Sequence, residues 1–422
     1  MYKSHYENVP FEIPESWCWT TLGELFDIVS AKRVLQSDWQ RTGIPFYRAR
    51  EIVRLSYEGY VDNDLFITEE HYNNLKKSYG VPEPSDIMLS AVGTIGRAYV
   101  VRNNDVFYYK DASVLCLRNV YHLNSEFIKW ILSSDLLQNQ MYENSKGTTV
   151  DTITIEKANS YFLPLPPIDE QYRIVKLLCE WDAYINDINK NKEEVLNNIR
   201  TCKSKILDLA ISGKLVPQDP NDEPAIELLK RINPGFKPCD NSHYENIEFD
   251  IPQNWVWATI GDIFEHNTGK ALNASNPNGT MLDYITTSNL YWDRFELSII
   301  KQMPFTESEI ERCIVRKGDL LICEGGDVGR AAIWDYDYNI MIQNHIHRLR
   351  GKVDICTRYF FYLFMHYKLH NLIGGKGVAI QGVSSRDLHN LIIPVPSLKE
   401  QYDIASSIDL YFSKLDMITA EL

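Results

Sequence analysis

The chain has 422 residues, more than one hydrophobic core usually organises, so its length predicts two or three domains. It contains no run of about eighteen apolar residues, and residues 1–10 are too polar for a signal peptide, so we expect a cytoplasmic protein that contacts no membrane. The eight cysteines are widely spaced and form no C-x-x-C pair, which predicts reduced, mostly packed thiols and no bound metal.

The net charge of −14 is unusual for a protein that binds phosphates, but the charge is unevenly distributed. Residues 30–157 hold 15 basic and 16 acidic side chains, and residues 267–390 hold 14 and 13, so both stretches are close to neutral. The segment from Lys32 to Arg54 contains six basic residues and only two acidic ones, Asp38 and Glu51. This local excess favours a surface that follows phosphates, although a solvated loop would have the same composition.

Residues 1–168 have the pattern of a mixed α/β module built from short, β-rich runs. Within this module, Asp86–Arg97 predicts a buried strand that ends in a glycine-rich turn, Gly93–Arg97. The backbone of such a turn can approach a ligand closely, and its arginine can bind a phosphate or a guanine edge. A plain hairpin turn with a surface arginine would have the same sequence, so both interpretations stay open.

Residues 169–213 predict one long helix. Apolar residues recur at spacings of four and three over five heptads, interrupted only by Lys192, as in the seam of a coiled coil. A helix from Glu170 to Ser212 would be about 64 Å long, and Gly213 and Pro217 would end it. The seam residues that we predict to form a helix or subunit interface are Ile174, Leu178, Trp181, Ile185, Val195, Ile199, Ile206 and Leu209.

After a linker over residues 214–242 that we expect to hold a short helix, residues 243–398 repeat the first module. His5–Pro14 returns as His243–Pro252, at an offset of 243 − 5 = 238, and a Trp-x-Trp follows both copies. Asp86–Arg97 returns as Asp319–Arg330, at an offset of 319 − 86 = 233. Motifs repeated at a nearly constant offset indicate a duplicated domain.

Residues 399–422 repeat the helical seam with Ile404, Ile408 and Leu415, over about half the length of the first helix. Such an apolar stripe is common in ordinary cores. Because the two helices follow equivalent modules, we predict that they pair as an antiparallel coiled coil with pseudo-twofold symmetry. The expected fold is therefore α+β, with two similar mixed α/β domains that are each followed by a helix. In this arrangement Val195–Leu209 would have no partner within the chain, which points to another polypeptide.

The sequence contains none of the catalytic motifs that we compared with it. It has no Asn-Pro-Pro-Tyr type loop for adenine methylation and no G-x-x-x-x-G-K-[ST] loop for ATP. Asp319 and Glu324 come nearest to a nuclease carboxylate pair, but glycines follow where a lysine is needed. His345 and His347 alternate on a predicted strand without a third metal ligand in sequence, which favours packing or hydrogen bonding. We therefore expect no catalytic residue.

Two segments at matched positions in the modules differ in chemistry. Ile44–Ile52 is basic and aromatic, whereas Leu282–Leu290 is rich in hydroxyl and amide groups. This divergence suits two modules that read different halves of a DNA site, although Ser, Thr and Asn also contact phosphates without sequence preference. The residues predicted to contact DNA are Lys32, Arg33, Arg41, Tyr47, Arg48, Arg50, Thr94, Arg97 and Lys146 in the first module, and Lys270, Thr286, Thr287, Ser288, Asn289, Arg330, Gln343, Asn344 and Lys376 in the second.

Four sets of motifs together resemble a known family. The Trp-x-Trp module starts, the turns that end in Gly-Arg-Ala, the helix start at Leu163–Tyr172 and above all Ser212–Pro224 resemble type I restriction-modification specificity subunits over nearly the whole chain. The resemblance implies two target-recognition domains that each read one half of a split target on double-stranded DNA, held apart by the coiled coil. It also implies a non-catalytic subunit that recruits methyltransferase (M) and restriction/translocase (R) subunits. S-adenosylmethionine, ATP and Mg²⁺ are then bound by those partners and not by this chain.

The chain departs from the family at its second helix, which ends at Leu422 instead of running as long as the central one. Either the chain is naturally short, or another polypeptide such as the M subunit covers the exposed seam. Two other functions also stay open: a stand-alone DNA methyltransferase or nuclease, and a tandem-module scaffold that binds only protein. The target sequence and the spacer length do not follow from the residues.

Overall fold

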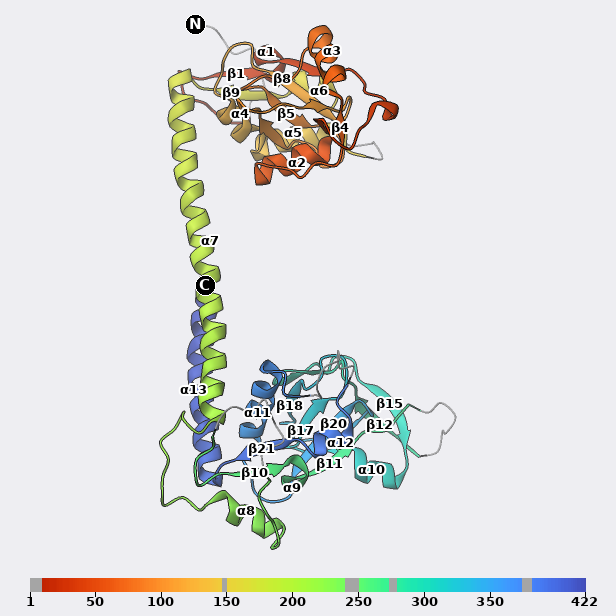
Figure 1. Ribbon diagram of the computed structural model, residues 1–422, viewed down its shortest axis with the longest axis vertical. Coiled ribbons are helices and arrows are strands. Elements are labelled where there is room, and N and C mark those ends of the chain that lie inside the picture. The colour runs from red at the N-terminus through yellow and green to blue at the C-terminus, as the bar shows by residue number, and fades with distance from the viewer. Residues whose placement is uncertain (1–9, 146–149, 240–249, 273–278, 374–381) are drawn as a thin grey trace. The chain divides into compact units, whose positions relative to one another are not determined.

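The computed structural model describes residues 10–145, 150–239, 250–272, 279–373 and 382–422 (Figure 1). The chain divides into two compact units, residues 1–188 and residues 189–422. Each unit has its own sheets and its own hydrophobic core.

The first unit is built on a four-stranded antiparallel sheet with the order β2-β8-β5-β6. Its strands are β2 (Asp27–Ser30), β8 (Val114–Arg118), β5 (Ile87–Ser90) and β6 (Ala98–Val100). Ile87 and Leu89 enter one core cluster and Met88 enters another, because successive side chains of a strand point to opposite faces. The central strands are therefore buried on both faces.

The other elements of this unit surround that sheet. In a separate two-stranded pairing, β1 and β9 bring the start and the end of the module together, so the chain leaves the module beside its start. The remaining elements are β1 (Cys18–Thr21), β9 (Phe162–Leu165), a small sheet of β3 (Ile44–Tyr47), β4 (Phe66–Ile67) and β7 (Tyr108–Tyr109), and the helices α1 (Leu22–Leu25), η1 (Gln36–Asp38), α2 (Ala49–Glu58), α3 (Glu69–Tyr79), α4 (Ser125–Leu132), α5 (Asp135–Ser145) and α6 (Ile155–Ser160).

The second unit repeats this plan after the short helix α8 (Ala225–Ile232). Its sheet β11-β20-β17-β18 matches β2-β8-β5-β6, and its pair β10-β21 matches β1-β9. The strands are β10 (Val256–Thr259), β11 (Phe264–Thr268), β12 (Thr280–Ile285), β13 (Leu290–Tyr291), β14 (Arg294–Phe295), β15 (Lys301–Phe305), β16 (Ile314–Val315), β17 (Leu320–Cys323), β18 (Ala331–Ile333), β19 (Ile340–Ile342), β20 (Ile346–Gly351) and β21 (Ile392–Val395), and the helices are α9 (Ile260–Ile263), α10 (Glu307–Cys313), α11 (Thr357–Leu369) and α12 (Ser385–His389). This confirms the predicted pair of similar mixed modules.

The predicted long helix forms as α7 (Ile168–Ile211), a single helix of 44 residues. In the second unit, α13 (Leu398–Glu421) lies antiparallel to the C-terminal half of α7 (Figure 1). The ammonium of Lys192 donates to the backbone oxygen of Leu422, and Lys203 forms an ion pair with Asp416. Residue numbers rise along one helix as they fall along the other, which is the antiparallel register predicted from the seam.

The prediction that Val195–Leu209 has no partner within the chain is wrong. Ile199 and Leu207 are buried, and Leu207 shares a core cluster with Ile404 and Ile408 of α13. In an antiparallel pair the start of α13 lies beside the end of α7, so a short α13 covers the C-terminal half of α7.

Burial of the predicted seam therefore changes along the helices. Ile199, Ile404 and Ile408 are buried, Ile174, Leu178, Ile206 and Leu415 are half-buried, and Trp181, Ile185, Val195 and Leu209 are exposed. In the part of the chain that the structure describes, no helix has both the length and the apolar character needed to cross a bilayer.

Candidate nucleic-acid interface

Two predicted contact segments of the first unit meet at one edge of its four-stranded sheet. Ser30 and Ser90, the last residues of β2 and β5, pair with adjacent residues at the start of β8. Lys32 follows β2 directly, and the Gly93–Arg97 turn connects β5 to β6. Antiparallel pairing therefore brings together two loops that are far apart in the sequence.

The second unit has the same arrangement. Thr268 and Cys323, the last residues of β11 and β17, pair with adjacent residues at the start of β20. The turn Gly325–Arg330 follows β17, and Gln343–Asn344 precedes β20. These loops lie at the edge that corresponds to the loop edge of the first unit.

Both turns require glycine. Gly93 and Gly96 have φ of 78° and 77°, and Gly326 and Gly329 have φ of 74° and 82°, which are left-handed values that strain other residues. A Cβ at Gly96 would also lie 2.6 Å from the sulfur of Met141. The tight turn determines where the arginine that follows it is placed.

That arginine lies over a tyrosine ring in both units. The guanidinium carbon of Arg97 is 5.3 Å from the ring centre of Tyr57, and that of Arg330 is 5.2 Å from the ring centre of Tyr291. Both Nε atoms are buried and have no hydrogen-bond partner among the described residues. A second nitrogen of Arg330 donates to the backbone oxygen of Thr287 at 2.7 Å. Stacking on the ring restricts the guanidinium plane, which favours a bidentate contact to a phosphate or a base edge.

The two tyrosines were not among the predicted contacts, but the repeat contained a signal for them. Tyr57 precedes Arg97 by 97 − 57 = 40 residues, and Tyr291 precedes Arg330 by 330 − 291 = 39. The tyrosine pair thus repeats at nearly the same offset as the turns.

The positive charge of the first edge is smaller than the sequence count suggests. Arg48 and Arg50 both bind Asp64, at 2.7 Å, and both also bind Glu51. Burial raises the pKa of the Glu51 carboxyl, but hydrogen bonds from the two arginines outweigh burial and hold the pKa below its usual value. The two arginines therefore organise the start of α2, and their charges are largely neutralised by the two carboxylates.

Three other basic residues of this segment are better placed to meet phosphates. Lys32, Arg33 and Arg41 are exposed, and none of them has an ion-pair partner among the described residues. The ammonium of Lys32 lies 5.3 Å from the ring centre of Tyr79, which leaves it open to solvent. Of the predicted basic residues in this segment, these three have the exposure that a phosphate contact requires.

Tyr47 is half-buried and packs against a core cluster. Its ring lies 4.8 Å from that of Phe107, centre to centre, and burial raises the pKa of its hydroxyl. Part of the side chain is thus used in packing, and the predicted DNA contact of Tyr47 stays a prediction.

Lys270, another predicted DNA contact, is buried. It is 6% exposed, and its ammonium binds Glu309 and the backbone oxygen of Pro304, at 2.7 and 2.6 Å. The hydrogen bond from Lys270 lowers the pKa of Glu309 from its ordinary 4.5 to about 2. Two of the three donors of this buried ammonium are therefore occupied within the protein, and the prediction that Lys270 contacts DNA has no support in the structure.

Asn289 is a structural residue of the loop after β12. Its amide nitrogen donates to the backbone oxygens of Glu296 and Ile299, and its oxygen accepts from the backbone nitrogen of Thr286. Asn289 is 8% exposed and its amide group is occupied by these hydrogen bonds, so the structure gives no support to the prediction that it contacts DNA. The hydroxyls beside it remain available.

The remaining predicted contacts differ in exposure. Thr94 and Ser288 are exposed, and Thr286, Thr287, Gln343 and Asn344 are half-buried. Lys146 and Lys376 lie outside the described residues.

Asp319 and His347, which the sequence analysis weighed as metal ligands, form hydrogen bonds within the protein instead. Asp319 is buried and accepts two hydrogen bonds from Arg350, at 2.7 and 2.6 Å. His347 is buried between His266 and the backbone oxygen of Val383, as the hydrogen-bonding interpretation predicted.

Comparison with known proteins identifies the family. Residues 14–198 and 252–422 match the type I restriction modification DNA specificity domain, once in each unit. The chain belongs to this family of specificity subunits. The match confirms the resemblance predicted from the motifs and the role in DNA sequence specificity.

Relatives of this specificity subunit extend over almost its whole length. The type I restriction enzyme EcoAI specificity subunit of Escherichia coli is 21% identical, covering 96% of this chain and 78% of the relative. The putative MjaX specificity subunit of Methanocaldococcus jannaschii is 22% identical, covering 93% of this chain and 86% of the relative.

Solved structures share the fold. The HsdS subunit from Thermoanaerobacter tengcongensis superposes with a TM-score of 0.63 at 16% identity, covering 98% of this chain and 93% of that one. A chain from a type I R-M system, solved to explain complex assembly and conformational transition, gives a TM-score of 0.68 at 17% identity, with coverage of 98% and 94%.

Proposed function

We propose that this specificity subunit reads a split target on double-stranded DNA and that each unit reads one half through its loop edge. The observation that carries the proposal is the arginine stacked on a tyrosine beside a glycine-rich turn, at the matched sheet edge of both units. The tyrosines are partly exposed, Tyr57 at 66% and Tyr291 at 36%, so core packing alone does not account for the repeated pair.

The two edges offer different donors to a duplex. The segment after β2 in the first unit has the exposed cations Lys32 and Arg33, whereas the second edge has the hydroxyls of Thr287 and Ser288 next to its arginine. Arginine suits guanine and phosphate, and hydroxyls suit several base edges. Edges of different chemistry fit two half-sites of different sequence.

We also propose that the chain is non-catalytic and works in the cytoplasm with M and R subunits. The relatives are specificity subunits of type I restriction enzymes, and one similar solved structure concerns the assembly of such a system. In this proposal the partners, and not this chain, bind S-adenosylmethionine, ATP and the Mg²⁺ that their chemistry needs.

The test maps methylated adenines in a host that carries this chain with its cognate M subunit. We expect a split motif, and we expect Arg97→Ala to alter one half of the motif and Arg330→Ala the other. Lys230→Ala, which changes an exposed lysine of α8 that is paired with Glu227, is the matched control and should leave the motif unchanged.

A contiguous motif, or loss of both halves in either arginine variant, would contradict reading by separate units. Methyl transfer or cleavage by the purified chain alone would contradict the non-catalytic role.

A further inference from the structure

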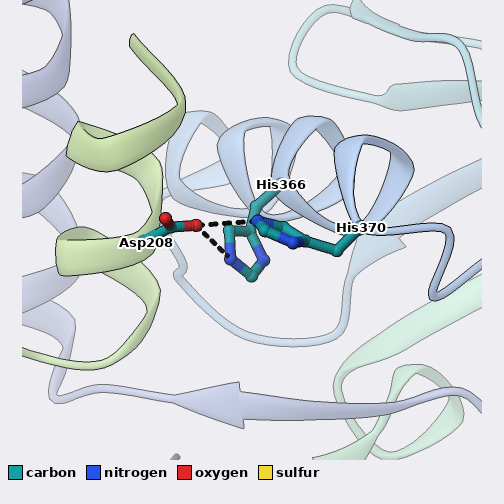
Figure 2. Close-up of side chains that lie close together, drawn as sticks. All are labelled: Asp208, His366 and His370. Atoms are coloured by element: carbon teal, nitrogen blue, oxygen red, sulfur yellow. Dashed lines mark hydrogen bonds and ion pairs between the residues drawn. The ribbon is translucent and has the colours of Figure 1, made fainter. Parts of the chain in front are cut away.

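A cluster of three side chains in the second unit lies outside the loop edge described above. His366 is in the last turn of α11, His370 follows directly after the helix, and Asp208 projects toward them from α7 (Figure 2). Residues four apart on a helix share one face, so both imidazoles leave α11 on the side that faces α7. The His-x-x-x-His spacing of these two residues is a signal for the cluster that the sequence does contain.

The three potential ligand atoms converge. The Nε2 atoms of His366 and His370 lie 3.2 and 2.7 Å from the same carboxylate oxygen of Asp208, and all three ligand atoms lie within 4.8 Å of one another. Around a tetrahedral ion with ligand bonds of about 2.0–2.1 Å, neighbouring ligand atoms are about 3.3 Å apart. The two separations between an imidazole and the carboxylate are therefore within about 0.6 Å of the spacing that an ion requires.

The neighbouring lysine does not compete with a metal ion for this cluster. The ammonium of Lys368, which lies between the two histidines in sequence, is held away from them by Asp327 at 2.9 Å and by the backbone oxygen of Val328 at 2.7 Å. The side chain of His366 is 7% exposed, whereas those of Asp208 and His370 are 34% and 42% exposed. Because Asp208 and His370 are accessible, an ion can reach the cluster from solvent, and a water molecule can complete its coordination.

We propose that Asp208, His366 and His370 form a binding site for a divalent transition-metal ion of the zinc type, which fastens α7 to α11. Two imidazoles and one carboxylate suit Zn²⁺, Co²⁺ or Ni²⁺, whereas Mg²⁺ and Ca²⁺ prefer oxygen ligands alone. Leu207 of α7 and Phe361 of α11 already share a core cluster, so the ion would reinforce an existing contact. This site is independent of the proposed DNA reading, and its failure would leave that proposal intact.

The experiment uses the full chain after treatment with a chelator and dialysis. Titration with Zn²⁺ alone, followed by calorimetry, should show one site that His370→Ala weakens at least about 100-fold, since one of three ligands is lost. At a Zn²⁺ concentration of about 100 times Kd, the midpoint of thermal unfolding should rise by about 5–10 °C in the wild type and not in the variant. Mg²⁺ should produce neither effect.

His345→Ala is the matched control, because His345 also pairs with a carboxylate, Glu324 at 3.1 Å, but is not in this cluster. It should keep the full affinity for Zn²⁺. Replacement of Zn²⁺ by Co²⁺ should give the visible absorption bands of a low-symmetry, four-coordinate site, and His366→Gln should abolish them.

His370 is accessible, so His370→Ala should fold even if a change at the buried His366 does not. Absence of Zn²⁺ binding by the wild type would overturn the proposal. Binding that His370→Ala leaves unchanged would overturn it as well, since the exposed cysteines would then be the ligands.

Discussion

Two exposed arginines between β2 and β3 of the first unit offer a direct test of where this specificity subunit meets DNA phosphates. Arg33 and Arg41 are exposed and form no ion pair with any described residue. Loss of a cation that contacts a phosphate removes one released counterion, which changes the salt dependence of binding as well as the affinity.

The expected size follows from the number of contacts. Each phosphate contact contributes about 0.9 to the slope of log affinity against log salt, so Arg33→Ala combined with Arg41→Ala should reduce the slope by about 1.8. Between about 50 and 200 mM salt, the wild type should then lose roughly tenfold more affinity than the double variant.

The assay is fluorescence anisotropy on a labelled duplex of mixed sequence over a series of salt concentrations. No target sequence is needed, because phosphate contacts dominate non-specific binding. Lys414→Ala, which removes an exposed charge from α13, is the control and should keep the wild-type slope. A folded double variant that also keeps the wild-type slope would refute the assignment of the segment between β2 and β3 to phosphate binding.

Buried groups of the second unit carry three further predictions. Ile408→Ala removes a fully buried side chain and should lower the free energy of unfolding by about 2–5 kcal/mol in urea titrations. Ile418→Ala, at a position that is 46% exposed, should lower it by less than about 1 kcal/mol. Equal costs would refute the assigned core. Asp319→Ala leaves Arg350 without its carboxylate partner and should lower the free energy of unfolding by about 3–5 kcal/mol. Lys317→Ala, which removes a surface ion pair, should lower it by less than about 1 kcal/mol, and the reverse order would contradict the pairing. Burial lowers the pKa of His266 from 6.5 to about 4, so its contribution to stability is fully present above pH 6.5 and is lost as the pH falls toward 4. The thermal midpoint should fall more steeply over this window in the wild type than in His266→Gln, and parallel curves would contradict the shift.

The candidate site was only partly predictable. The turns that place Arg97 and Arg330 follow from local glycine chemistry, which a sequence displays directly. The tyrosines beneath them come from other elements: their spacing repeats in the sequence, but their contact with the arginines is seen only in the folded chain. Lys270 appeared to be a free cation because its partner, Glu309, lies 309 − 270 = 39 residues away.

The duplicated modules and the long helix follow from the order of residues alone, because an offset repeat and a heptad spacing are local properties of the chain. Which half of α7 is covered by α13, which basic residues are neutralised and which histidines face Asp208 became known from the folded arrangement. Burial and ion pairing depend on partners that folding brings from distant positions. The periodicity of a sequence does not show which distant residues will become neighbours.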